Sequence, residues 1–290
     1  MLFDAETVVA VRDALPDFAV IGLRYATHLG DSAFLAFLVV LFYWFSGSLD
    51  TDRETAAFVL AAGVGCLALT VGLKGVVARP RPPQEVALVA ETGYSFPSAH
   101  ALGATVVYAL LAVFSDIGKR WQRFGVAGVL TVIIASSRVV IGVHYPGDVI
   151  VGVVVGTVYL AVVLRYFRDA ERVFLLALVV ALVGVAFGSR EYPAVAVGSS
   201  AGGFVFWRVL SRRIPPSPSH VSVAVVASVA SVFGVLFGIG LFVYLSLIDS
   251  YVLETTVAFL GSATSAGFVL AVPYVASWLD GHLDHGGRGG

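Results

Sequence analysis

The chain has 290 residues, of which 58% are hydrophobic and 13% charged, and its formal net charge is −1. The charged fraction is about half that of an ordinary soluble domain, and with a mean hydropathy of +0.92 it excludes an ordinary water-soluble fold. The near-zero net charge gives no indication of a nucleic-acid partner. Long apolar runs without alternating ten-residue patterns predict an all-α protein, a polytopic transmembrane helical bundle in a lipid bilayer.

Residues 1–29 combine apolar residues at helical spacing with charged ones, which predicts an amphipathic or interfacial segment. The apolar runs that follow predict about nine spans, at residues 30–46, 55–73, 98–114, 124–141, 147–167, 173–188, 193–210, 221–247 and 252–278. We expect residues 30–170 to hold the functional core, residues 171–279 to add further membrane helices, and residues 280–290 to form a flexible tail. Gly152 and Gly156 have the spacing of a close helix-packing surface.

Basic residues predict the side of the membrane on which each loop lies, because cytoplasmic loops are enriched in lysine and arginine. Basic clusters follow the third, fifth and seventh predicted spans, at Lys119, Arg120 and Arg123, at Arg165, Arg168 and Arg172, and at Arg208, Arg212 and Arg213. Alternating helices place all three on one side, which we expect to be cytoplasmic, with the N-terminus outside and the C-terminus inside. The preference for arginine over lysine, with much valine, alanine and glycine, is typical of a prokaryotic plasma-membrane protein from a GC-rich genome.

Two loops on the predicted outer side carry basic residues against that rule, which indicates that their charges meet an anion. Lys74 and Arg81 belong to the loop 74–97, and Arg138 begins the second loop. Two arginines and a lysine suit a phosphate group, because guanidinium groups form paired hydrogen bonds with its oxygens. Ser98 and the backbone N–H groups that follow it lie at a predicted helix start, which is a favourable place for an anion.

Two histidines on the same predicted side, His100 and His144, are candidates for nucleophilic attack and general acid chemistry. Asp148 follows His144 by four residues, so on a helix the two side chains share a face and the carboxylate orients the imidazole. The sequence has no acidic cluster for Mg²⁺, no glycine-rich phosphate loop and no zinc spacing among these histidines. Cationic side chains would therefore stabilise a transferring phosphoryl group.

Three separated segments of the chain resemble the signature of the type 2 phosphatidic acid phosphatase superfamily. The segments are Lys74-x6-Arg81-Pro82, Pro97-Ser98-Ala99-His100 and Ser137-Arg138-x5-His144-x3-Asp148. That superfamily includes lipid phosphate phosphatases, prenyl diphosphate phosphatases, glucose-6-phosphatase and the vanadium haloperoxidases. The resemblance covers roughly residues 30–170 and implies a six-helix phosphatase core.

The resemblance also implies a role for each residue of the signature. His144 would be the nucleophile that forms a phosphohistidine, Asp148 would orient it, and His100 would protonate the leaving oxygen and then activate water. The implied phosphate-binding residues are Lys74, Arg81, Ser98, Ala99 through its backbone N–H, and Arg138, with no metal and no cofactor. The family usually has glycine where this chain has Ala99, and alanine restricts the backbone, so we expect an altered rate or substrate geometry.

These features predict an integral membrane phosphatase that hydrolyses a lipid phosphate or a polyprenyl (di)phosphate without a metal ion. One alternative is a hydrolase of a small soluble phosphate ester, similar to glucose-6-phosphatase, which the span count alone supports. A second alternative is a transporter or a structural membrane protein, but the polar positions crowd into residues 74–148 without a counterpart in residues 170–278. His28 and Asp31 fall on the same outer side, and a place beside the site is the less favoured interpretation for them.

Overall fold

The computed structural model describes residues 2–188, 192–214, 218–229, 231–232 and 251–286, and within them every regular element is a helix. The α-helices are α1 (Ala5–Asp13), α2 (Asp17–Ala26), α3 (Ser32–Trp44), α4 (Arg53–Val77), α5 (Ala99–Phe114), α6 (Arg120–Val140), α7 (Pro146–Tyr166), α8 (Ala170–Ala186), α9 (Pro193–Leu210) and α11 (Tyr251–Gly286). Short 3-10 turns lie at Thr27–Gly30, Ser46–Leu49, Gln84–Val86 and Ser211–Arg213, and a further helix spans His220–Val229. The predicted all-α class is confirmed.

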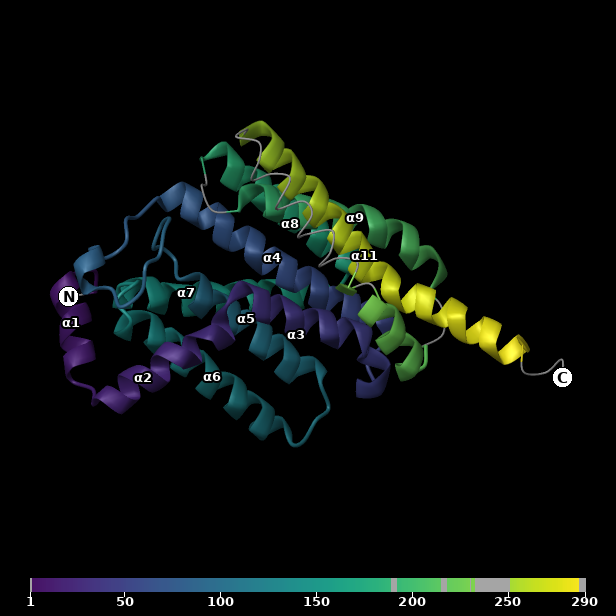
Figure 1. The fold of residues 1–290 in the computed structure, drawn as a ribbon, viewed down its shortest axis with the longest axis horizontal. Coiled ribbons are helices and arrows are strands. Elements are labelled where there is room, and N and C mark those ends of the chain that lie inside the picture. Colours follow the sequence, from purple (N-terminus) through teal and green to yellow (C-terminus); the bar gives the residue numbers. More distant parts are fainter. Residues whose placement is uncertain (1, 189–191, 215–217, 230, 233–250, 287–290) are drawn as a thin grey trace.

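Two groups of helices share α4 as their common element (Figure 1). Helices α5, α6 and α7 pack together on one side of it, and α8, α9 and α11 pack together on the other. Of the helices long enough to span a membrane, α4 has the largest buried share, 72%. Alanine, glycine and valine occupy most of its length, so neighbouring helices approach it closely on both sides.

The predicted count of nine spans is not confirmed. Among the described residues, five helices are long and apolar enough to cross a membrane, and a sixth span results if the pair Asp17–Gly30 and Ser32–Trp44, bent by 50°, counts as one. Helices α3, α5 and α8 have 13, 16 and 17 residues, shorter than an ordinary span. Apolar runs overcount spans here because short helices buried among others are as apolar as lipid-facing ones. Most of the predicted span 221–247 lies outside the described residues.

The glycines of α7 bring it against α5, as their spacing predicts. A Cβ on Gly152 would lie 2.9 Å from the carbonyl oxygen of Ser98, and one on Gly156 would lie 3.1 Å from that of Leu102. Side chains larger than hydrogen would therefore push the two helices apart. Because α5 and α7 begin at the same end of the molecule, this packing brings their first turns together.

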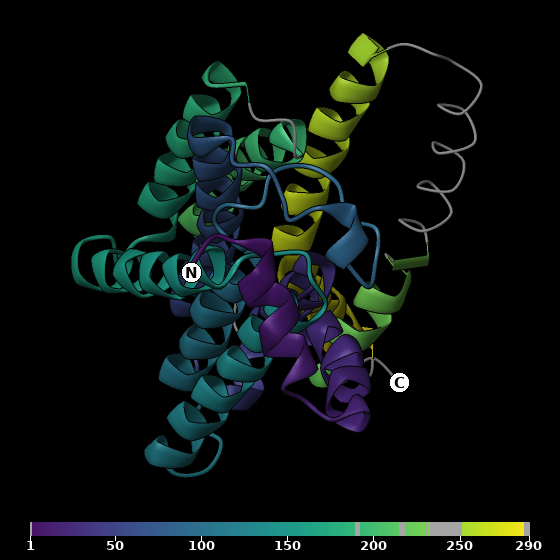
Figure 2. The same ribbon diagram turned by 90° about the vertical axis from the view of Figure 1, so that its left-hand side faces the viewer.

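Helices α1 and α2 lie across that same end, next to the loop 78–98 (Figure 2). The guanidinium of Arg12 donates a 2.8 Å hydrogen bond to the carbonyl of Val86, and the N–H of Gly147 donates one of 2.8 Å to the carbonyl of Leu2. The outer face of α2 exposes Phe18, Ile21 and Tyr25. Exposed aromatic and aliphatic residues on a short helix suit the interfacial position predicted for this segment.

Candidate active site

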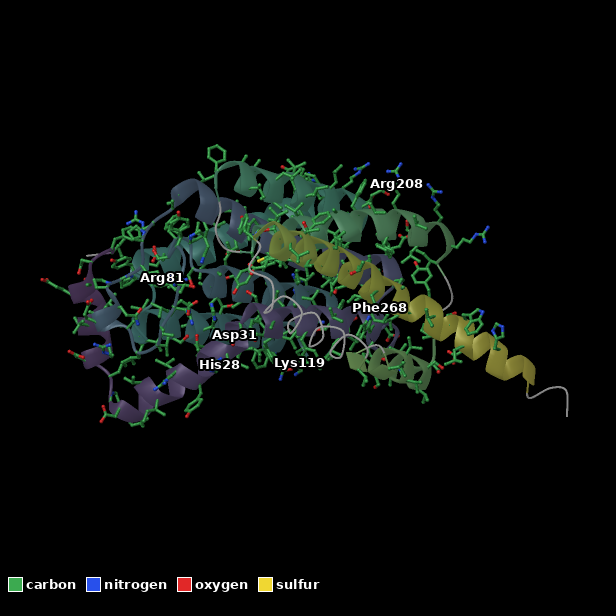
Figure 3. All side chains as sticks on the ribbon, turned by 45° about the horizontal axis from the view of Figure 1, so that its top comes forward. His28, Asp31, Arg81, Lys119, Arg208 and Phe268 are labelled. Atoms are coloured by element: carbon green, nitrogen blue, oxygen red, sulfur yellow. The ribbon has the colours of Figure 1, made fainter. Side chains whose placement is uncertain are left out.

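Six chain segments meet at one end of the helix bundle. They are the last turn of α4, the loop 78–98, the first turn of α5, the last turn of α6, the turn 141–145 and the first turn of α7. Together they bring all eight predicted site residues into one region, although these residues are spread over 75 positions of the sequence, from Lys74 to Asp148. Figure 3 labels Arg81 at this end and Arg208 toward the other.

Three cations, Lys74, Arg81 and Arg138, form the centre of the region. Lys74 and Arg138 are 2% and 3% exposed, so both charges are withdrawn from water. The ammonium of Lys74 donates to the carbonyl of Tyr94 at 2.8 Å, which directs it into the loop 78–98. Two buried cations are costly unless an anion compensates them, so the cluster is suited to binding one.

Arg81 joins this cluster to His144. Its guanidinium donates to the carbonyl of Thr92 at 2.9 Å and to that of Val143 at 3.1 Å, which fixes the side chain between two loops. One terminal nitrogen lies 3.2 Å from Nε2 of His144. An anion that binds Arg81 is therefore held next to a histidine nitrogen.

The turn between α6 and α7 places His144 beside Arg138. The backbone N–H groups of Val143 and His144 both point to the carbonyl of Arg138 at 3.2 Å, and Gly142 adopts a φ of 81° that favours glycine. His144 itself precedes α7, so the expectation that it shares a helical face with Asp148 is wrong in detail. The turn nevertheless brings Nδ1 of His144 to 3.6 Å from the nearer carboxylate oxygen of Asp148.

The pair His144 and Asp148 is fully enclosed, at 1% and 0% exposure. The nearer oxygen of Asp148 accepts a 3.0 Å hydrogen bond from the N–H of Tyr145, which anchors the carboxylate at the start of α7. Burial, assisted by the positive charges of Arg81, Arg138 and Lys74, lowers the pKa of His144 well below its ordinary value. The imidazole is therefore neutral at pH 7, with a lone pair available on one nitrogen.

The first turn of α5 adds hydrogen-bond donors to the region. Ser98 caps the helix, its hydroxyl accepting from the N–H of Ala101 at 3.4 Å, and its own N–H donates to the carbonyl of Asp148 at 3.1 Å. The N–H groups of Ala99 and His100 belong to the unpaired first turn, where the helix dipole favours negative charge. The backbone N–H of Ala99 therefore lies at a helix start, where a bound anion would be favoured.

Nε2 of His100 lies 2.8 Å from one carboxylate oxygen of Asp31, at the start of α3. The second oxygen of Asp31 lies 2.8 Å from Nδ1 of His28. Exposure rises along this chain of groups, from 14% for the side chain of His100 to 44% for Asp31 and 69% for His28. Asp31 thus lies directly against a predicted site residue, and His28 is linked to the region through Asp31; both are labelled in Figure 3.

Glu91 is a further residue of this region that the sequence pattern did not single out. One oxygen of its carboxylate lies 3.0 Å from Arg138 and the other lies 3.6 Å from Arg81. Burial raises the pKa of this carboxyl, but the charges of Arg138 and Arg81 outweigh burial and hold the pKa below its ordinary value. A charged carboxylate thus bridges the two arginines that are predicted to bind phosphate. The loop 78–98 holds two acids, Glu85 and Glu91, and nothing in the sequence distinguishes the one that meets the arginines.

Two other polar residues of the motifs lie outside this contact network. Arg79 stacks over the ring of Phe3, 4.0 Å from its centroid. The hydroxyl of Ser137 donates to the carbonyl of Ile134 at 2.6 Å, within its own helix. Among the described residues, no three His, Cys, Asp or Glu side chains gather in a geometry that would hold a metal ion.

Comparison with known proteins agrees with this geometry. The model of the PAP2 superfamily matches residues 53–172. Phosphatidylglycerophosphatase B of Bacillus subtilis (strain 168) is 33% identical over 155 residues, which cover 50% of this chain and 74% of that protein. Decaprenylphosphoryl-5-phosphoribose phosphatase of Mycobacterium tuberculosis (strain ATCC 25618 / H37Rv) is 31% identical over 168 residues, which cover 55% of this chain and 88% of that protein.

One solved structure is similar as well, the first transmembrane PAP2-type phosphatidylglycerolphosphate phosphatase from Bacillus subtilis. It superposes with a TM-score of 0.50 at 28% identity, covering 55% of this chain and 81% of that one. The segment that matches the family model includes all eight predicted site residues, from Lys74 to Asp148.

Proposed function

The chain belongs to the PAP2 superfamily and is a multi-pass membrane phosphatase, and we propose that it hydrolyses a lipid phosphate or polyprenyl (di)phosphate through a phosphohistidine, without a metal ion. The observation that carries this proposal is the position of Arg81, which contacts both the carboxylate of Glu91 and Nε2 of His144. A substrate phosphate that replaces that carboxylate on Arg81 and Arg138 lies beside a neutral imidazole nitrogen. Phosphorus held there would be within reach of the attacking nitrogen, as catalysis by His144 requires.

In the first step, the lone pair on Nε2 of His144 forms a bond to phosphorus while the bond from phosphorus to the leaving oxygen breaks. His100 gives a proton to that oxygen, so the product leaves as an alcohol or a phosphate monoester. Lys74, Arg81 and Arg138, with the N–H groups at the start of α5, neutralise the charge on the transferring phosphoryl group. Asp148 stabilises the positive charge that develops on His144.

In the second step, water attacks the phosphorus of the phosphohistidine and its proton passes to His100. The N–P bond breaks, its electron pair returns to His144, and inorganic phosphate leaves. Both histidines end in their starting protonation states, so the cycle closes without a metal-bound nucleophile.

A lipid substrate is supported by the relatives, whose names refer to phosphatidylglycerophosphate and decaprenylphosphoryl-5-phosphoribose. The alternative of a small soluble ester has the support of one relative, Glucose-6-phosphatase catalytic subunit 1 of Haplochromis xenognathus, which is 28% identical over 185 residues. The nine spans that first suggested this alternative are not confirmed. The basic clusters that begin at Lys119, Arg165 and Arg208 lie at or just after the ends of α5, α7 and α9, and for α5 and α7 these ends are opposite to the ends that form the site. This arrangement supports a site on the outer membrane face with cytoplasmic basic loops.

The test is phosphate release by the purified protein from phosphatidylglycerophosphate, a polyprenyl phosphate and a sugar phosphate, with and without chelator. We expect release from the lipids that persists in chelator and is abolished in His144→Ala. Acid-labile phosphate on the protein should accumulate in His100→Ala when the leaving group is activated. Release by His144→Ala at the wild-type rate would rule out the nucleophile, and loss of activity in chelator would rule out the metal-free mechanism.

A further inference from the structure

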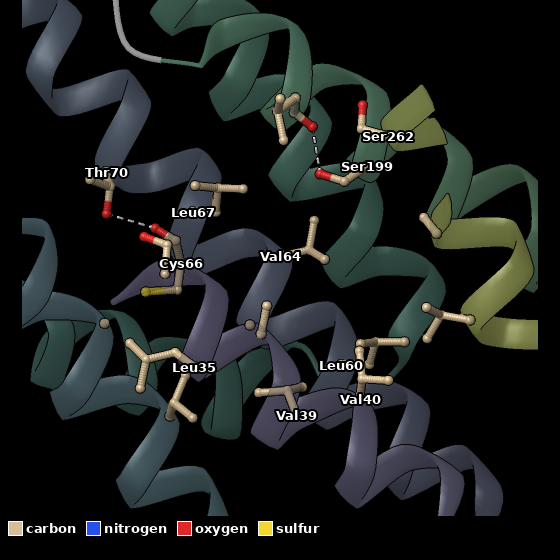
Figure 4. Close-up of a pocket in the computed structure, with 18 of the residues that line it drawn as sticks. Leu35, Val39, Val40, Leu60, Val64, Cys66, Leu67, Thr70, Ser199 and Ser262 are labelled. Atoms are coloured by element: carbon tan, nitrogen blue, oxygen red, sulfur yellow. Dashed lines mark hydrogen bonds between the residues drawn. The ribbon is translucent and has the colours of Figure 1, made fainter. Parts of the chain in front are cut away.

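An apolar cavity of about 410 Å³ lies between the family core and the C-terminal helices (Figure 4). Its walls come from α3, α4 and α5 on one side and from α8, α9 and α11 on the other. The volume falls within the range of about 300–1,000 Å³ that is usual for ligand pockets. Protein interiors rarely leave voids larger than a water molecule, so a space of this size is suited to an occupant.

The lining of the cavity presents mainly hydrocarbon to that occupant. The hydroxyls of Thr70, Ser199 and Ser262 donate to carbonyls one turn back in their own helices, at 3.0, 2.7 and 2.7 Å. Figure 4 shows the first two of these bonds. Because these hydroxyls already donate hydrogen bonds within the protein, they offer few further hydrogen bonds to a polar ligand. An alkyl or isoprenoid chain needs no hydrogen bonds and can bind there without that loss.

The cavity begins next to the phosphate region. Ala99, one of its lining residues, lies between Ser98 and His100, and Ser32 adjoins Asp31, which bonds to His100. From Ala99 the wall continues along α5 through Gly103 to Val107. Eight residues of helix correspond to about 12 Å, so the cavity leads away from the site into the apolar interior.

We propose that this cavity holds the hydrocarbon tail of the substrate while its phosphate lies on Arg81 and Arg138. The inference rests on the proposed phosphatase function and adds a binding site to it. The residues that close the cavity, such as Val195 of α9 and Ala266 of α11, lie beyond the segment that matches the family, 53–172. The C-terminal helices thus have a role in substrate binding, because they turn one face of the phosphatase core into a chamber for a single tail.

The first test fills the cavity from opposite walls with Val64→Phe and Ala266→Phe, and compares dodecyl phosphate with butyl phosphate in the same detergent. Each change should lower kcat/KM for dodecyl phosphate by about tenfold or more, since one misplaced methylene costs about 10–200-fold in apolar pockets. Butyl phosphate is too short to occupy the cavity, so its kcat/KM should stay near wild type. Val275→Phe, on an exposed face of α11, is the matched control.

The second test uses the wild-type protein and its single cysteine, Cys66, which lines the cavity. Dodecyl phosphonate should slow the reaction of Cys66 with methylmercury chloride, a small apolar reagent that binds buried thiols, severalfold, whereas butyl phosphonate should not. Equal loss of both substrates in the filled variants, or no protection of Cys66, would overturn the tail-binding proposal and leave lipid from the bilayer as the occupant. Absence of phosphate release from every ester would instead refute the phosphatase function itself.

A second inference rests on a separate observation, the hydrogen bonds that link His100, Asp31 and His28. We infer that Asp31 is a positioning residue for His100. Its carboxylate accepts from Nε2 and offsets part of the cost of charging this buried imidazole, so that Nδ1 can carry the proton that goes to the leaving oxygen. His28, exposed at the surface, connects this carboxylate to water.

The test is the dependence of kcat/KM on the leaving group in Asp31→Asn. With an alkyl phosphate, whose oxygen must be protonated as it leaves, kcat/KM should fall by about a hundredfold, the lower end of general acid effects. With p-nitrophenyl phosphate, whose leaving group needs no proton, it should stay near wild type, and Asp31→Glu should restore part of the alkyl activity. An equal loss with both leaving groups would show that Asp31 merely supports the structure, which would overturn the inference.

Discussion

Replacement of Glu91 by glutamine offers a sharp test of the anion site, because it should change ligand affinity and stability in opposite directions. In the free protein the carboxylate of Glu91 bridges Arg138 and Arg81, at 3.0 and 3.6 Å. A phosphate that binds these arginines must first displace the carboxylate. Glutamine keeps the shape of the side chain and removes its charge, so the displacement becomes easier.

The magnitude follows from the geometry of the two contacts. A hydrogen bond to a charged group contributes about 1.5–3 kcal/mol. The side chain of Glu91 is 33% exposed and its contact with Arg81 is long, so the lower end of that range applies. About 1.5 kcal/mol corresponds to roughly tenfold in a binding constant, so Kd for inorganic phosphate should fall by about tenfold in Glu91→Gln.

Titration calorimetry of phosphate or tungstate binding in detergent measures this change, with thermal unfolding recorded on the same samples. Without anion, Glu91→Gln should unfold at a lower temperature than wild type, since Arg138 is 3% exposed and loses a charged partner. Glu85→Gln, on an exposed part of the same loop, should leave both quantities unchanged. A weaker phosphate affinity in Glu91→Gln would show that Glu91 assists binding, and the reasoning would be wrong.

Three further predictions concern ionisation and the turn that holds the nucleophile. The ring resonances of His144 should not titrate between about pH 8 and 6, because its lowered pKa lies well below the ordinary value of about 6.5; a midpoint near 6.5 by NMR would contradict this. Because the pKa of Glu91 is lowered in the folded protein, its carboxylate stabilises the fold at pH values above the pKa of the unfolded state. This stabilisation disappears as the pH falls through the pKa of the folded state, so the unfolding temperatures of wild type and Glu91→Gln should converge in acid. Gly142→Ala should lower the free energy of unfolding by about 1–3 kcal/mol, because Gly142 has a φ of 81° and an added Cβ would collide with the carbonyl oxygen of Val86. Gly128→Ala, which places its Cβ in open space on α6, should leave the free energy of unfolding unchanged.

The sequence predicted which residues the fold brings together better than it predicted the number of spans. Residue type and spacing singled out Lys74, Arg81, Arg138 and His144, which meet at one end of the bundle, because cations and imidazoles near a bilayer are costly unless they have a use. The helix boundaries of the core also agree to within a few residues, since each polar loop separates two apolar runs. The number of spans failed because hydropathy does not distinguish a short helix buried in protein from a long one exposed to lipid.

The contacts of Asp31 and Glu91 could be found only in the folded structure. Asp31 meets His100 across 69 residues of sequence, and Glu91 meets Arg138 across 47. Neither spacing carries a local signal, since neither pair shares a helix or a turn. Their partners are set by the way α3 and the loop 78–98 pack over the start of α5, which is a tertiary property.

The geometry of Ala99 sharpens the question that its departure from the family pattern raised. Glycine is required where the backbone adopts a positive φ or where a Cβ would meet a neighbour. Ala99 is the first residue of α5 and therefore has helical dihedral angles, which alanine adopts readily. It also lines the apolar cavity. The N–H proposed to bind the anion is thus retained, and the methyl group adds apolar surface where the substrate tail would begin. An effect of alanine at this position should therefore depend on the tail of the substrate more than on its phosphate.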